Sequence, residues 1–375
     1  MTPLRRRSLL AAPAALLPLA RALAAAGPDA PEPDAPVPET PGLAAHAAAR
    51  RRFYGSALYE DALAADPGLL AHVRAECGML VGEYSFKWAS LQPQPGVFRF
   101  ATAETLMAFA AANRQRVRGH TLVWHEANPQ WLLDRLAPAT GERLLTGYIA
   151  AVAGHFRGRL VHWDVVNEPI HPEDGPPFGL RDTPWLRALG PGYLDLAFHA
   201  CAAADPGALR MINEFGVDYA IDWQQRRRDK LLELLAHLLA RGVPVQAVGL
   251  QAHLDAGERA LNQTVLARFV ADIASLGLKV VVTELDVRDD GLPADIAVRD
   301  AAVAAHARAW LDAVLANPAV LGVLSWGLSD RRSWLDQRFP RADGLPQRPL
   351  PLDASLRRKP LWSAIAAALA GAPAP

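Results

Sequence analysis

Residues 279–284 read KVVVTE, a short run that is apolar in its centre and ends in a carboxylate. Three consecutive valines leave no polar face, so both faces of the strand that they predict must be covered. A strand that is buried on both faces is typical of a parallel sheet flanked by helices. The stretch therefore indicates an α/β fold, with Glu284 at the end of its strand.

Similar runs recur along the chain, and each is followed by a longer amphipathic stretch rich in Ala and Leu, such as residues 144–156, 223–241 and 294–316. No GxGxxG turn follows the first predicted strand, which argues against an open nucleotide-binding sheet. Eight repeats of strand and helix in 375 residues predict a single (β/α)₈ TIM barrel. The predicted strands are residues 53–58, 79–83, 117–123, 160–167, 209–213, 245–251, 279–284 and 321–326.

The composition is that of a globular protein with balanced charge. Apolar residues make up 51% of the chain, and 39 basic residues equal 39 acidic ones. This balance gives no reason to expect nucleic acid or an anionic membrane as the partner, and it would suit a neutral polymer. We expect a monomer that needs no cofactor and no metal.

The N-terminus has the layout of an export signal. Arginines 5–7 lead into an apolar run, residues 9–20, and small residues follow at 22–26. The apolar run is too short to span a bilayer, and Pro13 and Pro18 interrupt it. We predict a twin-arginine-like signal over residues 1–26 and a periplasmic or extracellular protein, with a basic, disordered tail as the alternative.

Residues 27–42 are rich in Pro, Ala and acidic residues, and they predict an extended tether before a catalytic domain over residues 43–372. The chain has two cysteines, Cys77 and Cys201. Export would permit a disulfide. Both lie in or beside apolar helical stretches, which favours two separate buried thiols, and their spacing excludes a CxxC site.

The active site of a (β/α)₈ barrel lies at the C-terminal ends of its strands. Seven of the eight predicted strands bring polar or aromatic residues to that rim, which random surface polarity would not do. The residues are Glu83, His120, Trp124, Asn167, Glu168, Asn213, Glu214, Gln251, His253, Glu284, Asp286 and Trp326.

Glu168 and Glu284 end strands on opposite sides of the ring, so their side chains could meet over its mouth. A separation of ~5–5.5 Å is typical of retaining glycosidases, in which one carboxyl group is protonated and the other is ionised. Asn167 could bind a sugar hydroxyl, and His253 could orient Glu284 while Asp286 holds the imidazole. Taken singly, each motif could also be a strand end followed by a solvated turn.

The sequence closely resembles glycoside hydrolase family 10, the retaining xylanases, over roughly residues 45–370. The resemblance rests on several motifs in the family's order. They are residues 119–125 (GHTLVWH), 163–168 (WDVVNE), 249–253 (GLQAH), 282–286 (VTELD) and 325–330 (SWGLSD), the last followed by Ser333-Trp334.

This resemblance implies an endo-1,4-β-xylanase that acts on xylan and xylo-oligosaccharides, with Glu168 as the general acid/base and Glu284 as the nucleophile. It implies Trp124 and Trp334 as aromatic walls of the cleft. It also suggests a cis peptide bond between His120 and Thr121. The residues implied in binding the sugars before the cleaved bond are Glu83, Lys87, His120, Asn167, Gln251 and Trp326. The long segment 330–353, which carries Trp334, reads as a loop that shapes the substrate site.

Two positions depart from the family's pattern. Tyr84 stands where the family usually has Asn, which changes the contacts to the second sugar before the cleaved bond. Phe215 and Gly216 replace a usual Tyr and Asn after the fifth strand, which changes contacts on the leaving-group side.

Other functions stay open at this point. The same glutamates could serve a retaining glycosidase for another β-glycan, although the set Lys87, His120 and Trp326 favours xylose. A non-catalytic polysaccharide-binding barrel would have lost one glutamate. A barrel metal hydrolase using His120, His125 and His253 would usually have paired histidines on its first strand, and residues 53–58 contain none.

Overall fold

The computed structural model describes residues 34–375 except residues 176 and 259, and residues 34–375 form one compact unit. The predicted export signal and the first part of the predicted tether, residues 27–33, lie outside the described residues. No helix in the described part is both long and apolar enough to cross a membrane.

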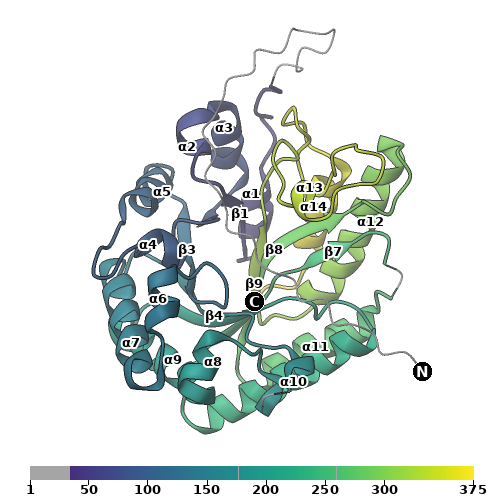
Figure 1. Ribbon diagram of the computed structural model, residues 1–375. Coiled ribbons are helices and arrows are strands. Elements are labelled where there is room, and N and C mark those ends of the chain that lie inside the picture. The colour runs from purple at the N-terminus through teal and green to yellow at the C-terminus, as the bar shows by residue number, and fades with distance from the viewer. Residues whose placement is uncertain (1–33, 176, 259) are drawn as a thin grey trace, which may run out of the picture. The chain divides into compact units, whose positions relative to one another are not determined.

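Among the described residues, eight parallel strands close into a barrel surrounded by helices (Figure 1). Neighbours pair in order from β1 to β6, β6 pairs with β8, and β9 closes the ring on β1. The predicted (β/α)₈ barrel is confirmed. Its strands are β1 (Phe53–Leu58), β2 (Met79–Gly82), β3 (Arg116–Val123), β4 (His162–Asn167), β5 (Leu209–Glu214), β6 (Ala247–Leu250), β8 (Lys279–Arg288) and β9 (Val320–Ser325).

A further strand, β7 (His253–Asp255), was not predicted. It has three residues and extends the sheet at the C-terminal part of β8, where His253 lies opposite Asp286. Three residues are too few to show a periodic pattern, so sequence alone gives no signal for it. Its pairing places the His253 side chain beside the rim of the barrel.

The outer layer consists of helices of 10 to 20 residues that alternate with the strands. They are α3 (Pro67–Glu76), α5 (Ala101–Ala112), α7 (Pro138–His155), α9 (Tyr193–Ala204), α10 (Asp222–Ala240), α11 (Gln263–Ser275), α12 (Ile296–Leu315) and α14 (Pro360–Gly371). Shorter helices are α1 (Leu43–Ala48), α2 (Ala62–Ala65), α4 (Trp88–Leu91), α6 (Gln130–Arg135), α8 (Pro184–Leu189), α13 (Leu335–Arg338), and the 3₁₀ turns η1 (Pro172–Asp174), η2 (Pro177–Gly179) and η3 (Gly190–Gly192).

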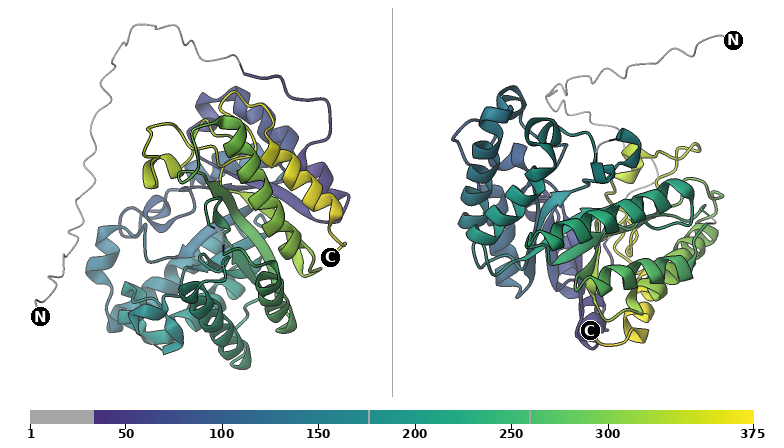
Figure 2. Two further views of the ribbon diagram at one scale, coloured as in Figure 1. Left: turned by 90° about the vertical axis from the view of Figure 1, so that its right-hand side faces the viewer. Right: turned by 90° about the horizontal axis from the view of Figure 1, so that it is seen from below.

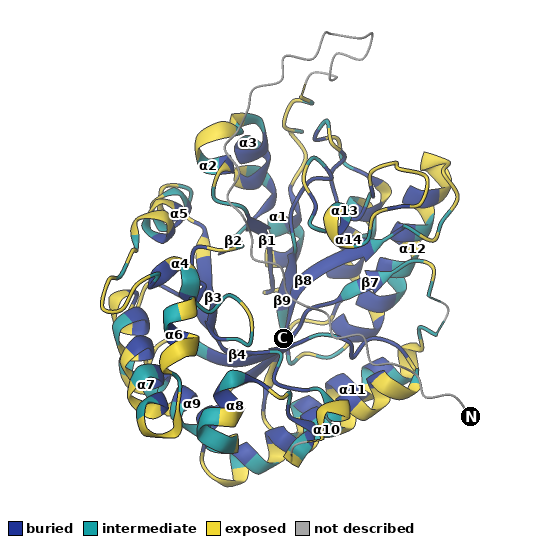
Figure 3. Ribbon diagram, in the orientation of Figure 1, coloured by how far each residue is buried: buried dark blue, intermediate teal, exposed yellow. Residues whose placement is uncertain are grey.

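The valines that opened the sequence argument divide between two apolar cores. Val281 points into the barrel, where it packs with Met79, Met211 and Leu324, whereas Val280 and Val282 pack against the helices outside. Both faces of β8 are thus buried, as Figure 3 shows for the strands at the centre. This is the reason that the strand carries no polar alternation.

The first described residues lie on the barrel. Asp34 forms an ion pair with Arg331, and the Ala35 amide donates to Ser355 O at 2.9 Å. The two ends of the described chain also meet, because α1 packs against α14 (Figure 2). Cys77 and Cys201 are buried and free, which confirms the prediction of two separate thiols.

Candidate active site

A cleft of about 980 Å³ lies over the C-terminal ends of the strands. It is lined by every residue that the sequence predicted to bind substrate or act in catalysis, with the exception of Asp286, which is fully buried behind it. The predicted residues at its surface are Glu83, Lys87, His120, Trp124, Asn167, Glu168, Gln251, His253, Glu284, Trp326 and Trp334.

Glu284 lies on β8 and is held on both of its carboxylate oxygens. Asn213 Nδ2 donates to Oε1 at 2.6 Å, and His253 Nε2 donates to Oε2 at 3.2 Å. Asn213 is itself fixed by Thr283 Oγ1, which donates to its Oδ1 at 2.7 Å. The carboxylate is therefore oriented before any substrate arrives.

The surroundings of Glu284 keep it ionised. Burial alone would raise the pKa of this carboxyl group. The hydrogen bond from His253, together with the positive charges of His120, His253 and Arg118, outweighs burial and lowers the pKa to about 2. An ionised, buried and positioned carboxylate is what a nucleophile at an anomeric carbon requires.

His253 lies between two carboxylates. Its Nδ1 donates to Asp286 Oδ1 at 2.8 Å, while its Nε2 faces Glu284. Burial opposes the charge, but the carboxylates of Asp286 and Glu284 raise the pKa of this imidazole well above its usual value. Asp286 Oδ2 also accepts from Trp334 Nε1 at 2.7 Å, so the same carboxylate positions the aromatic wall of the cleft.

Glu168 follows β4 directly and has a positive φ of 54°, a left-handed conformation that is uncommon for a residue with a side chain. Its backbone is fixed on both sides, because its amide donates to Asn213 O at 2.8 Å and its carbonyl accepts from Arg181 Nε at 2.9 Å. Its carboxylate accepts from Trp124 Nε1 and from Gln251 Nε2, both at 3.0 Å. Glu168 and Glu284 thus face one cleft from opposite strands.

One end of the cleft is built around Lys87, whose side chain is buried. Burial lowers the pKa of its ammonium group, although Glu284, Glu83 and Glu168 oppose that shift. The ammonium lies 4.7 Å from the Tyr84 ring centroid and 4.8 Å from that of Trp124, within the range of cation–π contacts.

His120 and Trp326 complete this end. Their rings meet edge to face with 5.3 Å between the ring centroids, and His120 Nδ1 contacts Asp164 Oδ2 at 2.7 Å. Arg118 pairs with the same carboxylate, so a fully buried ion pair supports the histidine from below. The peptide bond between His120 and Thr121 is cis, as the family resemblance suggested.

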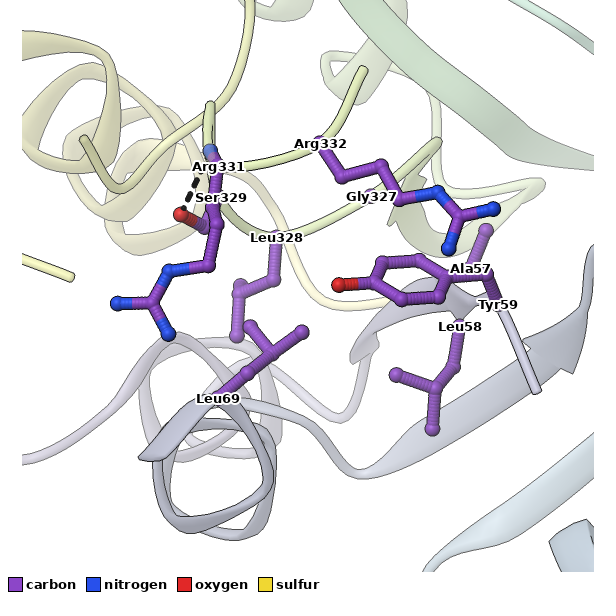
Figure 4. Close-up of a pocket in the computed structure, with 9 residues that line it drawn as sticks. All are labelled: Ala57, Leu58, Tyr59, Leu69, Gly327, Leu328, Ser329, Arg331 and Arg332. Carbon is purple, nitrogen blue, oxygen red and sulfur yellow. Dashed lines mark hydrogen bonds between the residues drawn. The ribbon is translucent and has the colours of Figure 1, made fainter. Parts of the chain in front are cut away.

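A second, smaller hollow lies beside this end, between the loop after β9 and the end of β1 (Figure 4). Its volume is about 10 Å³, room for no more than a single water molecule. The Arg332 guanidinium lies 3.9 Å from the Tyr59 ring centroid there. The hollow is too small to hold a sugar. Arg332, which lines it, acts on Glu83 in the cleft: burial and Glu60 raise the pKa of Glu83 to about 7, while the positive charges of Arg332 and Lys87 oppose this rise.

Comparison with known proteins agrees with this geometry. The sequence model of glycosyl hydrolase family 10 matches residues 42–368. The chain belongs to glycosyl hydrolase family 10.

Similar proteins include endo-1,4-beta-xylanase 5 of Pyricularia oryzae, which is 34% identical over 308 residues, 80% of this chain and 71% of that protein. Endo-1,4-beta-xylanase 1 of Humicola insolens is 32% identical over 330 residues, 85% of this chain and 72% of that protein. Xylanase 10B of Thermotoga maritima superimposes with a TM-score of 0.80 at 29% identity, covering 88% of this chain and 98% of that one. Xylanase 10B of Thermotoga petrophila, solved with xylobiose, gives a TM-score of 0.81 at 29% identity with the same coverage.

The departures from the family 10 pattern fall at the two ends of the cleft. Tyr84 is 57% exposed and lines the cleft beside Lys87. Phe215 and Gly216 line the opposite end. The predicted catalytic residues Glu168 and Glu284 are both present in the same cleft.

Some working residues received no role from the sequence. Asn213 stood among the rim residues, but its contacts to Glu284 and to Asn167 Oδ1, at 2.9 Å, appear only when β5 and β8 are closed around β6. Asp164 lies inside the motif of residues 163–168, and nothing in the sequence indicates that its carboxylate contacts His120. Glu214 also proved to be fully buried and paired with Arg227 at 2.9 Å.

Proposed function

We propose that this protein is an endo-1,4-β-xylanase that hydrolyses internal β-1,4-xylosidic bonds with retention, using Glu284 as the nucleophile and Glu168 as the general acid/base. The observation that carries the proposal is the state of Glu284. It is buried, oriented by Asn213 and His253, and kept ionised in the same cleft as a second carboxyl group. Two such carboxyl groups across a cleft are the machinery of glycoside hydrolysis.

In the first step a Glu284 oxygen attacks the anomeric carbon and forms an ester bond to it. The bond from that carbon to the leaving-group oxygen breaks, and this oxygen takes the proton of Glu168. In the second step Glu168, now a carboxylate, takes a proton from water. The water oxygen attacks the same carbon, the ester bond to Glu284 breaks, and two inversions give net retention.

His253 stabilises the charge on Glu284 before attack. Because its pKa is raised well above the usual value, it stays protonated at neutral pH and donates to Asp286 and Glu284 together. It therefore acts as a fixed positive charge with no proton to give up during the cycle. A fixed charge of this kind costs no reorganisation at the moment of reaction.

Support for xylan as the substrate comes from two directions. The curated relatives are named endo-1,4-beta-xylanases, and the Thermotoga petrophila structure holds xylobiose. In this chain, Lys87, His120 and Trp326 crowd the end of the cleft beside the nucleophile. Close packing there disfavours the hydroxymethyl group that glucose carries and xylose lacks.

The product profile of the purified protein tests this proposal. Linear xylan should yield short β-1,4-xylo-oligosaccharides, and carboxymethyl cellulose should yield little soluble sugar. The anomer first released, read by NMR, should be β. Activity on cellulose but not on xylan would refute xylan as the substrate. A first-formed α product would refute the retaining mechanism.

We also propose that residues 1–26 are a twin-arginine-like export signal and that the mature protein acts outside the cytoplasm. The arginines at 5–7, the apolar run and the small residues before residue 27 support this. N-terminal sequencing of the exported protein should begin near residue 27, and replacing Arg6 and Arg7 by Lys should leave the precursor in the cytoplasm. An uncleaved protein that stays in the cytoplasm would refute the signal.

A further inference from the structure

The two ends of the cleft hold different parts of the sugar chain. The family resemblance implies Lys87, His120 and Trp326 in binding the sugars before the cleaved bond, and the positive charge of His120, whose ring meets that of Trp326, acts on Glu284. The opposite end lies beside the backbone of Glu168, because Arg181 Nε donates to the Glu168 backbone carbonyl at 2.9 Å. A general acid protonates the leaving group, so the end beyond Arg181 receives the sugars that depart.

An aromatic wall stands at this leaving-group end. The Arg181 guanidinium lies 5.7 Å from the ring centroid of Phe215, which follows β5 and lines the cleft. Next along this wall comes Trp223, at the start of α10, which is 40% exposed and also lines the cleft. A large aromatic side chain that is left exposed inside a cleft is a typical ligand contact.

Gly216 is the reason that Trp223 can occupy this place. A Cβ atom at position 216 would lie 2.5 Å and 2.7 Å from two carbons of the indole ring. Gly216 also has a φ of +65°, which disfavours any side chain there. The residue that departs from the family pattern therefore makes room for an aromatic ring from the next helix.

Arg227 holds both rings from behind. It is buried, its Nη1 donates to Glu214 Oε1 at 2.9 Å, and its guanidinium lies 4.3 Å from the Phe215 centroid and 5.8 Å from that of Trp223. The helix start that carries Trp223 is fixed as well, because Gln224 Oε1 accepts from the amides of Asp218 and Tyr219, each at 2.6 Å. The indole is thus positioned before substrate binds, which reduces the entropy lost on binding.

We propose that Trp223 is a specificity-determining residue that stacks on a xylose ring of the leaving-group part of the chain, beyond the sugar that contacts Glu168. This inference rests on the proposed function. The apolar C–H face of a β-linked pyranose covers the exposed indole and removes both from water. The platform favours long chains, because only they extend far enough past the cleaved bond to reach it.

Steady-state kinetics with two substrates test the platform. For Trp223→Ala, kcat/KM on xylohexaose should fall on the order of tenfold. On an aryl β-xylobioside, whose leaving group ends near Glu168, it should fall much less. Trp223→Phe should recover most of the xylohexaose rate. The bonds cut in end-labelled xylohexaose should also shift away from those that leave several sugars on the departing side.

Ile296→Ala is a matched control, because Ile296 is an exposed apolar residue at the start of another helix and does not line the cleft. It should change neither rate nor cleavage pattern. Equal losses on both substrates for Trp223→Ala, or an unchanged cleavage pattern, would overturn the role of Trp223. A parent enzyme that cleaves neither xylohexaose nor the xylobioside would instead refute the proposed function, so the two failures are distinguishable.

Discussion

His253 is the residue on which the charge balance of the site depends, because it is the cation shared by Glu284 and Asp286. Without it, two buried carboxylates would lie close together with no shared counter-charge. Burial would then raise the pKa of Glu284, which now is about 2. The protonation state of the proposed nucleophile is therefore set by a residue of the neighbouring strand β7, 31 positions earlier in the sequence.

His253→Asn should move the acid limb of the pH profile to higher pH. The folded pKa of Glu284 is lowered, so the ionised nucleophile persists as the pH falls through the usual range of a glutamate. Loss of the imidazolium should raise that pKa by about 1–3 units, so the variant should lose activity under mildly acidic conditions that the parent tolerates. The measurement is kcat/KM on an aryl β-xylobioside against pH.

Unfolding at low pH could imitate this result, so each sample should be held at the test pH and then assayed at neutral pH. Full recovery shows that the limb reports ionisation. An acid limb at the same pH in both proteins would show that His253 does not set the charge of Glu284.

Azide should distinguish the two glutamates. In Glu168→Ala, an activated aryl xyloside still forms the ester with Glu284. Hydrolysis of this ester is slow because the variant has no general base to activate water, so turnover should fall by several orders of magnitude. Azide needs no base and should restore turnover, giving the β-glycosyl azide. In Glu284→Ala it should attack directly from the vacated face and give the α-glycosyl azide, and an exchange of these anomers would reverse the two assignments.

At the level of single residues, the sequence predicted the polar residues that follow apolar strands. It did not predict contacts between residues that are far apart in the sequence. Glu168 directly follows β4, and Glu284 lies within β8, which runs four residues beyond the predicted end to Arg288. The barrel rule still brings both to one rim. The link from Asn213 to Glu284 joins residues 71 positions apart. Trp223 could not be predicted from a pattern, because its place in the cleft depends on the missing side chain at Gly216.

Among the elements, the loop between β9 and α14, which contains the short helix α13, is held by side-chain contacts to other parts of the barrel. It carries Trp334 into the cleft, and Arg341 ties it to the segment after β8. Arg341 donates from Nη2 to Leu292 O at 2.9 Å and from Nη1 to Asp289 O. Asp289 is itself paired with Arg299 of α12 at 2.7 Å. The substrate-shaping role of this loop was predicted from the sequence, but these anchors were not.

Arg341→Leu should loosen this loop. The change leaves the carbonyls of Asp289 and Leu292 without their donor and should lower the free energy of unfolding by about 2–5 kcal/mol. It should also raise KM for xylan, because the loop that carries Trp334 loses an anchor, while the hydrogen bonds that orient Glu284 remain. Denaturant titration and steady-state kinetics measure the two effects.

Arg308→Leu provides the comparison for that experiment. Arg308 forms an exposed ion pair with Asp312 on α12, so its loss should change stability by less than about 1 kcal/mol and leave KM unchanged. If both variants behaved alike, the loop would not depend on Arg341.

On the scale of the whole described chain, the barrel must be closed between its first and last strands. β9 pairs with β1, and outside this seam α14 covers α1 and α12. The repeat of strands and helices predicted closure, because eight βα units leave no free edge. The polar contacts that hold the two ends together were not predicted, since they join residues more than 280 positions apart.

Glu76 is the centre of those contacts and gives a test of closure that is separate from catalysis. It ends α3, just before β2, and so lies at the end of the barrel opposite the cleft. Its Oε2 accepts from the Leu43 amide at 2.8 Å and from Trp362 Nε1 at 2.9 Å, and its Oε1 accepts from Arg358 Nε at 2.8 Å. One fully buried carboxylate thus joins α1, α3 and α14.

Glu76→Ala should destabilise the protein by about 3–5 kcal/mol, because it leaves three donors, one of them a partly buried guanidinium, without their acceptor. Glu233→Ala is the matched control. Glu233 pairs with Lys230 at 2.7 Å on the exposed face of α10, so its loss should cost less than about 1 kcal/mol. Thermal unfolding should separate the two variants, while both keep the parent kcat/KM below their transitions. A Glu76→Ala protein that melts with the control would show that strand pairing alone closes the barrel, and a folded variant with reduced kcat/KM would show that the seam also reaches the cleft.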